Sequence, residues 1–191
     1  AAMKAVRDRA QDSFNRLSER LTEDVQSRVN RSMYGLKGAR GMYAATDALD
    51  RSAFKAYVAS RDLPTEFPGA LGFGFIWRLE RHNLDSFEDA ARADGAPEFH
   101  VHRYSNGDMI GDASDLLIIE YIYPRERNLG AEGLDIGSER VRRDAAEHAI
   151  RTGEPTISGC VKLVQDELQR VGFLYFLPVY KNGTRPATPA E

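Results

Sequence analysis

The sequence predicts an α+β fold in which a long N-terminal helix precedes a small domain built around a central antiparallel sheet. Residues 1–49 contain no proline and repeat apolar side chains at helical spacing. After about residue 67 the composition changes to short apolar runs separated by glycine and proline. Strand patterns then outnumber helix patterns, and two late ones flank a short polar segment, as in an antiparallel hairpin.

The first segment, residues 1–50, is predicted to form one amphipathic helix. Charged residues fill one face, and apolar residues recur every eleven positions on the other, at Met3, Phe14, Val25 and Leu36. An eleven-residue repeat favours a nearly straight association of helices. Nearly fifty helical residues would measure about 70 Å, which is longer than a small domain is wide. We therefore expect a dimerising stalk, and a helix lying across its own domain is the alternative.

Three glycines interrupt this helix pattern near its end. Each costs up to about 1 kcal/mol in an exposed helix, so Gly35, Gly38 and Gly41 predict either a break or a close helix contact. Residues 51–66 are expected to connect the stalk to the domain through a short helix around Ser52–Ser60. The segment LPTEFPGA, at 63–70, is predicted to be a loop.

The globular domain is expected to span residues 67–183. We predict strands at 71–79, 99–104, 116–123, 156–164 and 172–180, and helices at 83–93 and 139–152. Ser138 is the predicted N-cap of the second helix, and Gly153 its stop. The polar segment QDELQR separates the last two strands, which favours an antiparallel hairpin. Residues 184–191 are expected to be a linker.

Composition excludes several functions. A net charge of −3 without a basic stripe argues against a nucleic-acid partner. No apolar run approaches the roughly 18 residues of a membrane span, and the N-terminus has no signal-peptide pattern. The chain as given is therefore expected to be soluble. Cys160 is the only cysteine, so it forms no disulfide framework, and its apolar surroundings predict a buried structural thiol.

Catalytic and cofactor patterns are weak. His100 and His102 alternate on a predicted strand, with His82 nearby, but nothing fixes the third ligand that a zinc site needs. A metal-dependent enzyme using His100, His102 and Glu120 stays an alternative to two surface histidines. Gly72 and Gly74 lack the third glycine of a dinucleotide-binding loop, so they are expected to let a backbone or ligand approach a strand. We predict no cofactor, no metal and no catalysis.

The stretch LLIIEYIYPRERN, at 116–128, is the least ordinary part of the chain. An apolar strand stops at Pro124 and is followed directly by Arg125, Glu126 and Arg127. A solvated surface turn is one interpretation. A binding site at the end of the strand is the other.

Three segments carry a resemblance to a known family. They are FPGALGFGFIWRLER, YIYPRERNLGAEGLDIGSE, and AIRTGEPTISGCVKLVQ followed by GFLYFLPVYKNG, together covering 67–183. They resemble the CHASE domain, the extracytoplasmic sensory module of bacterial histidine kinases, nucleotide cyclases and plant cytokinin receptors. The resemblance implies a membrane-distal, PAS-like domain in the periplasm and a homodimer through the N-terminal helix. The second domain, membrane segments and output module of such a receptor are expected to lie outside this chain.

The resemblance also implies ligand-binding residues. Cytokinin receptors hold the adenine of their ligand with an aspartate at a strand end and a threonine further along, and an ungapped alignment places Glu126 and Ser158 there. Tyr121 and Tyr123 are expected to supply a flat apolar wall. Arg125 and Arg127 either neutralise Glu126 or hold an anionic ligand instead. The expected ligand is a small molecule, adenine-like or anionic. A constitutive dimerisation module without ligand is the alternative.

Overall fold

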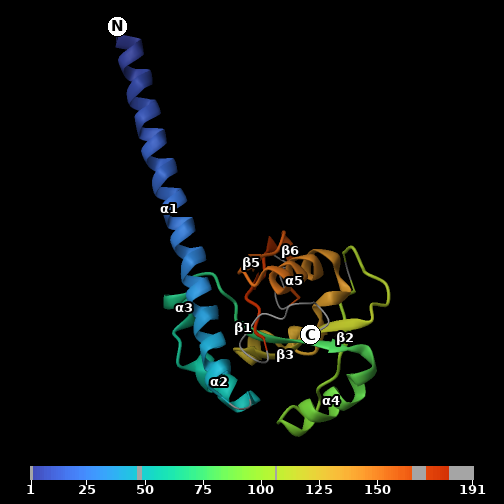
Figure 1. Cartoon of the computed structure of the whole chain (residues 1–191). Coiled ribbons are helices and arrows are strands. Elements are labelled where there is room, and N and C mark those ends of the chain that lie inside the picture. The colour runs from blue at the N-terminus through green and yellow to red at the C-terminus, as the bar shows by residue number, and fades with distance from the viewer. Residues whose placement is uncertain (1, 47–48, 106, 165–170, 181–191) are drawn as a thin grey trace.

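The computed structural model describes residues 2–46, 49–105, 107–164 and 171–180. Its first element is α1 (Ala2–Ala45), which projects far beyond the rest of the chain (Figure 1). The predicted long helix is therefore confirmed. Next comes α2 (Arg51–Ala59), where the Asp50 carboxylate accepts a hydrogen bond from the N–H of Ala53 at 2.7 Å. The predicted loop that follows is wrong at its start, because α3 (Leu63–Glu66) forms one helical turn there, with proline in its first turn.

The glycines of α1 mark where the helix meets its own domain. A Cβ atom on Gly35 would lie 2.7 Å from the rings of Phe67 and Phe73, and one on Gly38 would lie 2.5 Å from the Tyr57 hydroxyl. That hydroxyl donates to the carbonyl of Gly35 at 2.8 Å. The predicted break is wrong, because α1 stays helical throughout. The predicted close contact with another helix is confirmed, since Tyr57 lies on α2.

A four-stranded sheet forms the centre of the domain, in the order β1-β3-β4-β2. β1 and β3 run antiparallel, from Phe73 opposite Tyr123 to Glu80 opposite Asp115, and β4 is antiparallel to β3. β2 is parallel to β4, so the sheet is mixed and not antiparallel throughout as predicted. The strands are β1 (Phe73–Glu80), β2 (His102–Arg103), β3 (Asp115–Tyr123) and β4 (Leu134–Asp135). The predicted strand at 99–104 is thus shorter than expected, and β4 was not predicted.

A bulge at Glu120 changes which face of the sheet the end of β3 presents. The pairing moves from Ile119 opposite Ile76 to Tyr121 opposite Phe75, which leaves Glu120 as the extra residue. Before the bulge, Leu117 and Ile119 pack toward α5 (Arg140–Thr152). After it, Tyr121 and Tyr123 pack in the cluster around α2 on the opposite face.

The two faces of the sheet are covered by different helices (Figure 1). α5 covers one face; α2 and α4 (Leu84–Ala93) cover the other. The predicted N-cap of α5 is wrong. Glu139 caps the helix by accepting hydrogen bonds from the N–H groups of Val141 and Arg142, both at 3.1 Å. Ser138 instead accepts from the N–H of Tyr104. Gly153 ends α5 as predicted, with a left-handed φ of 77°.

The late strands form two separate ladders outside the central sheet. The predicted hairpin pairing is confirmed, because Val161 pairs antiparallel with Gly172. Each long predicted strand is nevertheless split into two, β5 (Thr156–Ile157) with β6 (Val161–Lys162) and β7 (Val171–Gly172) with β8 (Tyr175–Phe176). β5 pairs with β8. The QDELQR segment and the predicted linker at 184–191 lie outside the described residues.

Cys160 lies in the break between β5 and β6 and is exposed. The predicted buried thiol is therefore wrong, because the break interrupts the in-and-out alternation on which that prediction depended. Among the described residues, no helix combines the length and apolar character that crossing a membrane requires.

Candidate functional site

The candidate site is the turn of Arg125, Glu126 and Arg127 at the end of β3. It is a single 3₁₀ turn that follows a cis bond between Tyr123 and Pro124. The fully buried Asn128 fixes it, since its side-chain amide donates to the carbonyls of Pro124 at 2.7 Å and of Leu71 at 3.2 Å. Asn128 therefore holds the turn in place from its buried side.

Gly72 completes this support, because a Cβ atom there would lie 2.7 Å from the carbonyl oxygen of Tyr123. Gly74 is also tight, at 3.2 Å from the carbonyl of Tyr121. The prediction that this glycine pair admits a neighbouring backbone is confirmed.

Glu126 and Arg127 are exposed on the outside of this turn. Within the described part of the chain, the Glu126 carboxylate has no hydrogen-bond or ion-pair partner. Arg125 instead donates a hydrogen bond from Nε to Oε2 of Glu132 at 2.9 Å, and its Nη2 forms an ion pair with the same oxygen at 2.8 Å. The hydrogen bond to Glu132 raises the pKa of Arg125. The turn thus presents one exposed carboxylate that Arg125 attracts by its charge but does not bind directly among the described contacts.

Beneath the turn lies a buried polar cluster centred on Arg51, the first residue of α2. Its guanidinium pairs with Oε1 of Glu132 and donates to the carbonyl of Glu120 at 3.3 Å. It also donates to the carbonyl of Asp94 at 3.1 Å and lies over the ring of Tyr121 at 5.2 Å. Sequence reasoning missed this cluster, because its members come from distant segments. Only Glu120 stood out, as the one acid within an apolar strand.

The carboxylate of Glu120 is itself buried and accepts a hydrogen bond from Nε1 of Trp77. Burial raises the pKa of Glu120, and the Trp77 hydrogen bond opposes this shift only in part. Burial also raises the pKa of Tyr121, whose hydroxyl donates to Asp94 at 3.1 Å. The charges under the turn are therefore held in a largely dehydrated environment.

Tyr121 and Tyr123 lie on one face of β3, as predicted. Tyr121 is 3% exposed and Tyr123 is 8% exposed. The centroids of their rings lie 5.7 and 6.1 Å from the ring centroid of Phe54 on α2. This packing does not support their predicted role as the wall of an open pocket. They instead join the end of β3 to α2.

Ser158 is buried in the ladder between β5 and β8. Its hydroxyl donates to the carbonyl of Gly159 at 2.8 Å and accepts from the N–H of Leu174 at 2.9 Å. Among the described residues, no hydrogen bond joins Ser158 to the turn at 125–127. The hydroxyl of Ser158 is thus already engaged by Gly159 and Leu174.

The histidines of the metal alternative are near one another. The ring centroids of His100 and His102 lie 5.7 Å apart, but His102 faces the carbonyl of Glu132 at 3.1 Å, and the carboxylate of Glu120 is bound to Trp77. Nδ1 of His82 lies 3.3 Å from Oε2 of Glu80. No group of three or more metal-ligating side chains occurs among the residues that the structure describes.

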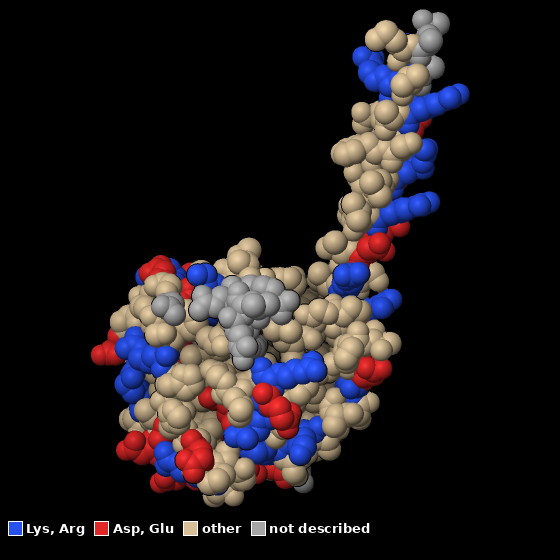
Figure 2. All heavy atoms as spheres, turned by 180° about the vertical axis from the view of Figure 1, so that it is seen from behind, with Lys and Arg blue, Asp and Glu red and all other residues tan. Residues whose placement is uncertain are grey.

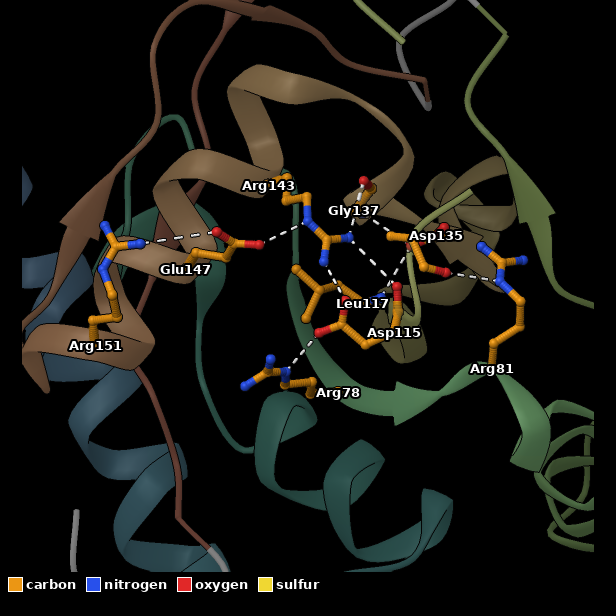
Figure 3. A network of polar contacts seen from close by, with 10 residues as sticks. Arg78, Arg81, Asp115, Leu117, Asp135, Gly137, Arg143, Glu147 and Arg151 are labelled. Carbon is orange, nitrogen blue, oxygen red and sulfur yellow. Dashed lines mark hydrogen bonds and ion pairs between the residues drawn. The ribbon is translucent and has the colours of Figure 1, made fainter. Parts of the chain in front are cut away.

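A second polar network ties α5 to the central sheet (Figure 3). Arg143 pairs with Asp115 at the start of β3 and donates to Glu147 at 2.7 Å, while Arg78 donates to Asp115 at 2.7 Å. Burial opposes ionisation of Asp115, yet the hydrogen bonds from Arg78 and Arg143 lower its pKa. Because these charges neutralise one another, we assign this network to stability.

The projecting part of α1 exposes an apolar stripe. Figure 2 shows uncharged side chains along one side of the helix and Lys and Arg along another. The exposed apolar residues are Met3, Val6, Phe14, Leu17, Leu21, Val25 and Tyr34, of which Phe14 is 65% and Val25 62% exposed. Leu36 is different, because it packs against the domain's own core. The domain thus covers only the end of the predicted stripe.

Comparison with known families gives one result. The family model described as CHASE domain matches residues 47–191, well over half of the chain. No curated protein matches the chain significantly.

Proposed function

Because the chain belongs to the CHASE domain family, we propose that it is the ligand-sensing part of a dimeric bacterial transmembrane receptor. CHASE domains are extracytoplasmic sensor modules of receptors and are not catalytic. We therefore place this chain in the periplasm, where it binds a small molecule and passes the signal through paired stalk helices. A histidine kinase or nucleotide cyclase would supply the output from another part of the receptor.

The observation that carries ligand binding is the exposed, unpartnered carboxylate of Glu126 on a turn that is held from below. Asn128 fixes the turn by hydrogen bonds, and Gly72 leaves room for this close approach, so a ligand does not have to order the turn. A carboxylate accepts N–H donors, and a charged hydrogen bond contributes about 1.5–3 kcal/mol. Glu126 is therefore the residue on which we expect affinity to depend most.

Two classes of small molecule are candidates for the ligand. A flat molecule bearing N–H groups, such as an N6-substituted adenine, would donate to Glu126. An anion would need Arg125 or Arg127. The pairing of Arg125 with Glu132 leaves Arg127 as the more available guanidinium for an anion, because an anion at Arg125 would have to compete with a buried carboxylate. Ser158 stays a proposed secondary contact.

Calorimetry of the wild type and Glu126→Ala, titrated with N6-benzyladenine and with benzoate, tests this proposal. We expect N6-benzyladenine to bind and Glu126→Ala to weaken its binding about tenfold or more, since about 1.4 kcal/mol is a factor of ten. An anion held by the arginines predicts the opposite sign, because removing Glu126 would strengthen benzoate binding. Glu98→Ala, which removes another exposed carboxylate, is the matched control.

If substitutions of Glu126, Arg125 and Arg127 leave the affinity of both probes unchanged, the turn is an ordinary solvated surface. The constitutive dimerisation module would then be the better proposal, supported by the exposed apolar stripe of α1. Metal bound to the purified protein would point instead to the enzyme alternative with His100 and His102.

A further inference from the structure

One buried carboxylate joins two segments that are far apart in the sequence. Glu132 has a side chain that is 8% exposed, and it uses both of its oxygens. Oε1 pairs with Arg51 at the start of α2, and Oε2 accepts one hydrogen bond from Nε of Arg125 in the turn and forms an ion pair with its Nη2. Because the two guanidinium groups share one dehydrated partner, a change at one alters the electrostatic environment of the other.

Arg51 is fixed on the α2 side of this link. Its backbone N–H donates to Oδ2 of Asp94 at 2.9 Å, and its guanidinium donates to the carbonyls of Asp94 and Glu120. It is 7% exposed. The first turn of α2 is therefore bound to the sheet through the same side chain that contacts Glu132.

α2 in turn is packed on the stalk. The hydroxyl of Tyr57 donates to the carbonyl of Gly35 in α1, and Leu36 and Met42 of α1 pack in the same apolar cluster as Phe54. A displacement at the start of α2 is thus transmitted to α1 by close-packed contacts.

Arg125 is the accessible end of the link. Its side chain is 42% exposed, and it neighbours Glu126, the proposed ligand contact. A ligand at Glu126 can therefore change the hydrogen bonding of Arg125 without opening the core.

We propose that Glu132 is a positioning residue that couples the turn at 125–127 to α2 and, through α2, to the stalk. As a route for signalling this rests on the proposed function, but the coupling belongs to the unliganded chain and can be measured there. Linkage makes the coupling reciprocal: if ligand binding favours one stalk arrangement, that arrangement raises the ligand affinity by the same factor.

Hydrogen exchange of the whole unliganded chain tests the coupling. Arg125→Ala should slow amide exchange in α2 (Arg51–Ala59) by about tenfold, within the range typical of coupled sites, because Arg51 no longer shares Glu132 with a second cation. Arg127→Ala is the matched control, because it removes the same charge from the same turn without touching Glu132. It should leave exchange in α2 at the wild-type rate. In a Glu132→Gln background, Arg125→Ala should have little further effect on α2.

Two results would overturn the proposal. One is an Arg125→Ala variant whose exchange changes in the turn but does not slow in α2. The other is an Arg127→Ala variant that slows exchange in α2 as much as Arg125→Ala does. If Glu132→Gln does not fold, the two arginine variants decide by themselves. No ligand is present, so failure here leaves the role of Glu126 open, and failed calorimetry leaves this coupling intact.

Discussion

Glu120 is a charged residue within the apolar run of β3. It lies on the bulge of β3 with its carboxylate buried against Trp77, and burial raises its pKa. A carboxyl group whose pKa is higher in the folded than in the unfolded state binds its proton more tightly in the folded state. Its ionisation therefore lowers the free energy of unfolding as the pH rises through the folded-state pKa.

Glu120→Gln should remove this pH dependence, since the amide keeps the shape and can still accept from Trp77. We expect the wild type to lose stability relative to Glu120→Gln over the pH range that begins at the usual glutamate pKa of about 4.3 and extends upward to the raised pKa of the folded state. Urea unfolding of both proteins across this range measures the difference. If the free energy of unfolding varies with pH in the same way for both proteins, burial does not raise the pKa of Glu120.

At the scale of single residues, the sequence could not predict contacts between distant segments. Glu126 could be singled out because it lies two residues after the proline that ends an apolar strand, and its role in ligand binding stays a prediction. Glu132 and Arg51 could not, because their contact joins positions 81 apart and neither lies in a recognisable motif. Cys160 was predicted wrongly, because nothing local shows that its strand breaks.

Substitution by alanine is expected to have opposite effects on stability at two glycines of α1, Gly35 and Gly41. Gly35 faces the rings of Phe67 and Phe73, whereas a Cβ atom on Gly41 would meet no atom within 4 Å. Alanine gains up to about 1 kcal/mol over glycine in a helix interior. At Gly41 this gain should appear as increased stability, but at Gly35 the displaced core rings should outweigh it.

Chemical denaturation of Gly35→Ala and Gly41→Ala measures the two effects against each other. We expect the midpoint to fall for Gly35→Ala and to rise for Gly41→Ala. The same sign for both substitutions would mean that α1 does not lie against the domain as described.

Elements with many residues were predicted more accurately than short ones. α1, α2, α4, α5, β1 and β3 each carry a periodic pattern long enough to recognise. β2, β4 and the ladders of β5–β8 have only two residues per strand, so they have no period to detect. The cap of α5 was misplaced by one residue, because Ser138 and Glu139 can both accept hydrogen bonds from helix N–H groups.

On the scale of the whole molecule, the chain combines a domain that covers the end of α1 with a long remainder of that helix whose apolar stripe is uncovered. Exposed apolar surface of this extent favours association, and a second copy would cover it along the whole projecting length. The arrangement suits a receptor in which binding at Glu126 shifts the balance between two stalk arrangements. This requires the ligand to have different affinities for the two.

Native mass spectrometry of the freshly purified protein tests the dimeric, ligand-binding receptor most directly. We expect a species at twice the chain mass of 21.4 kDa that retains a small organic molecule. The Phe14→Glu, Val25→Glu double variant should be monomeric, because it places charges in the apolar stripe, and Glu126→Ala should lose the small molecule but stay dimeric. A wild type that is monomeric and free of ligand, or a double variant that dimerises as well as the wild type, would contradict this account.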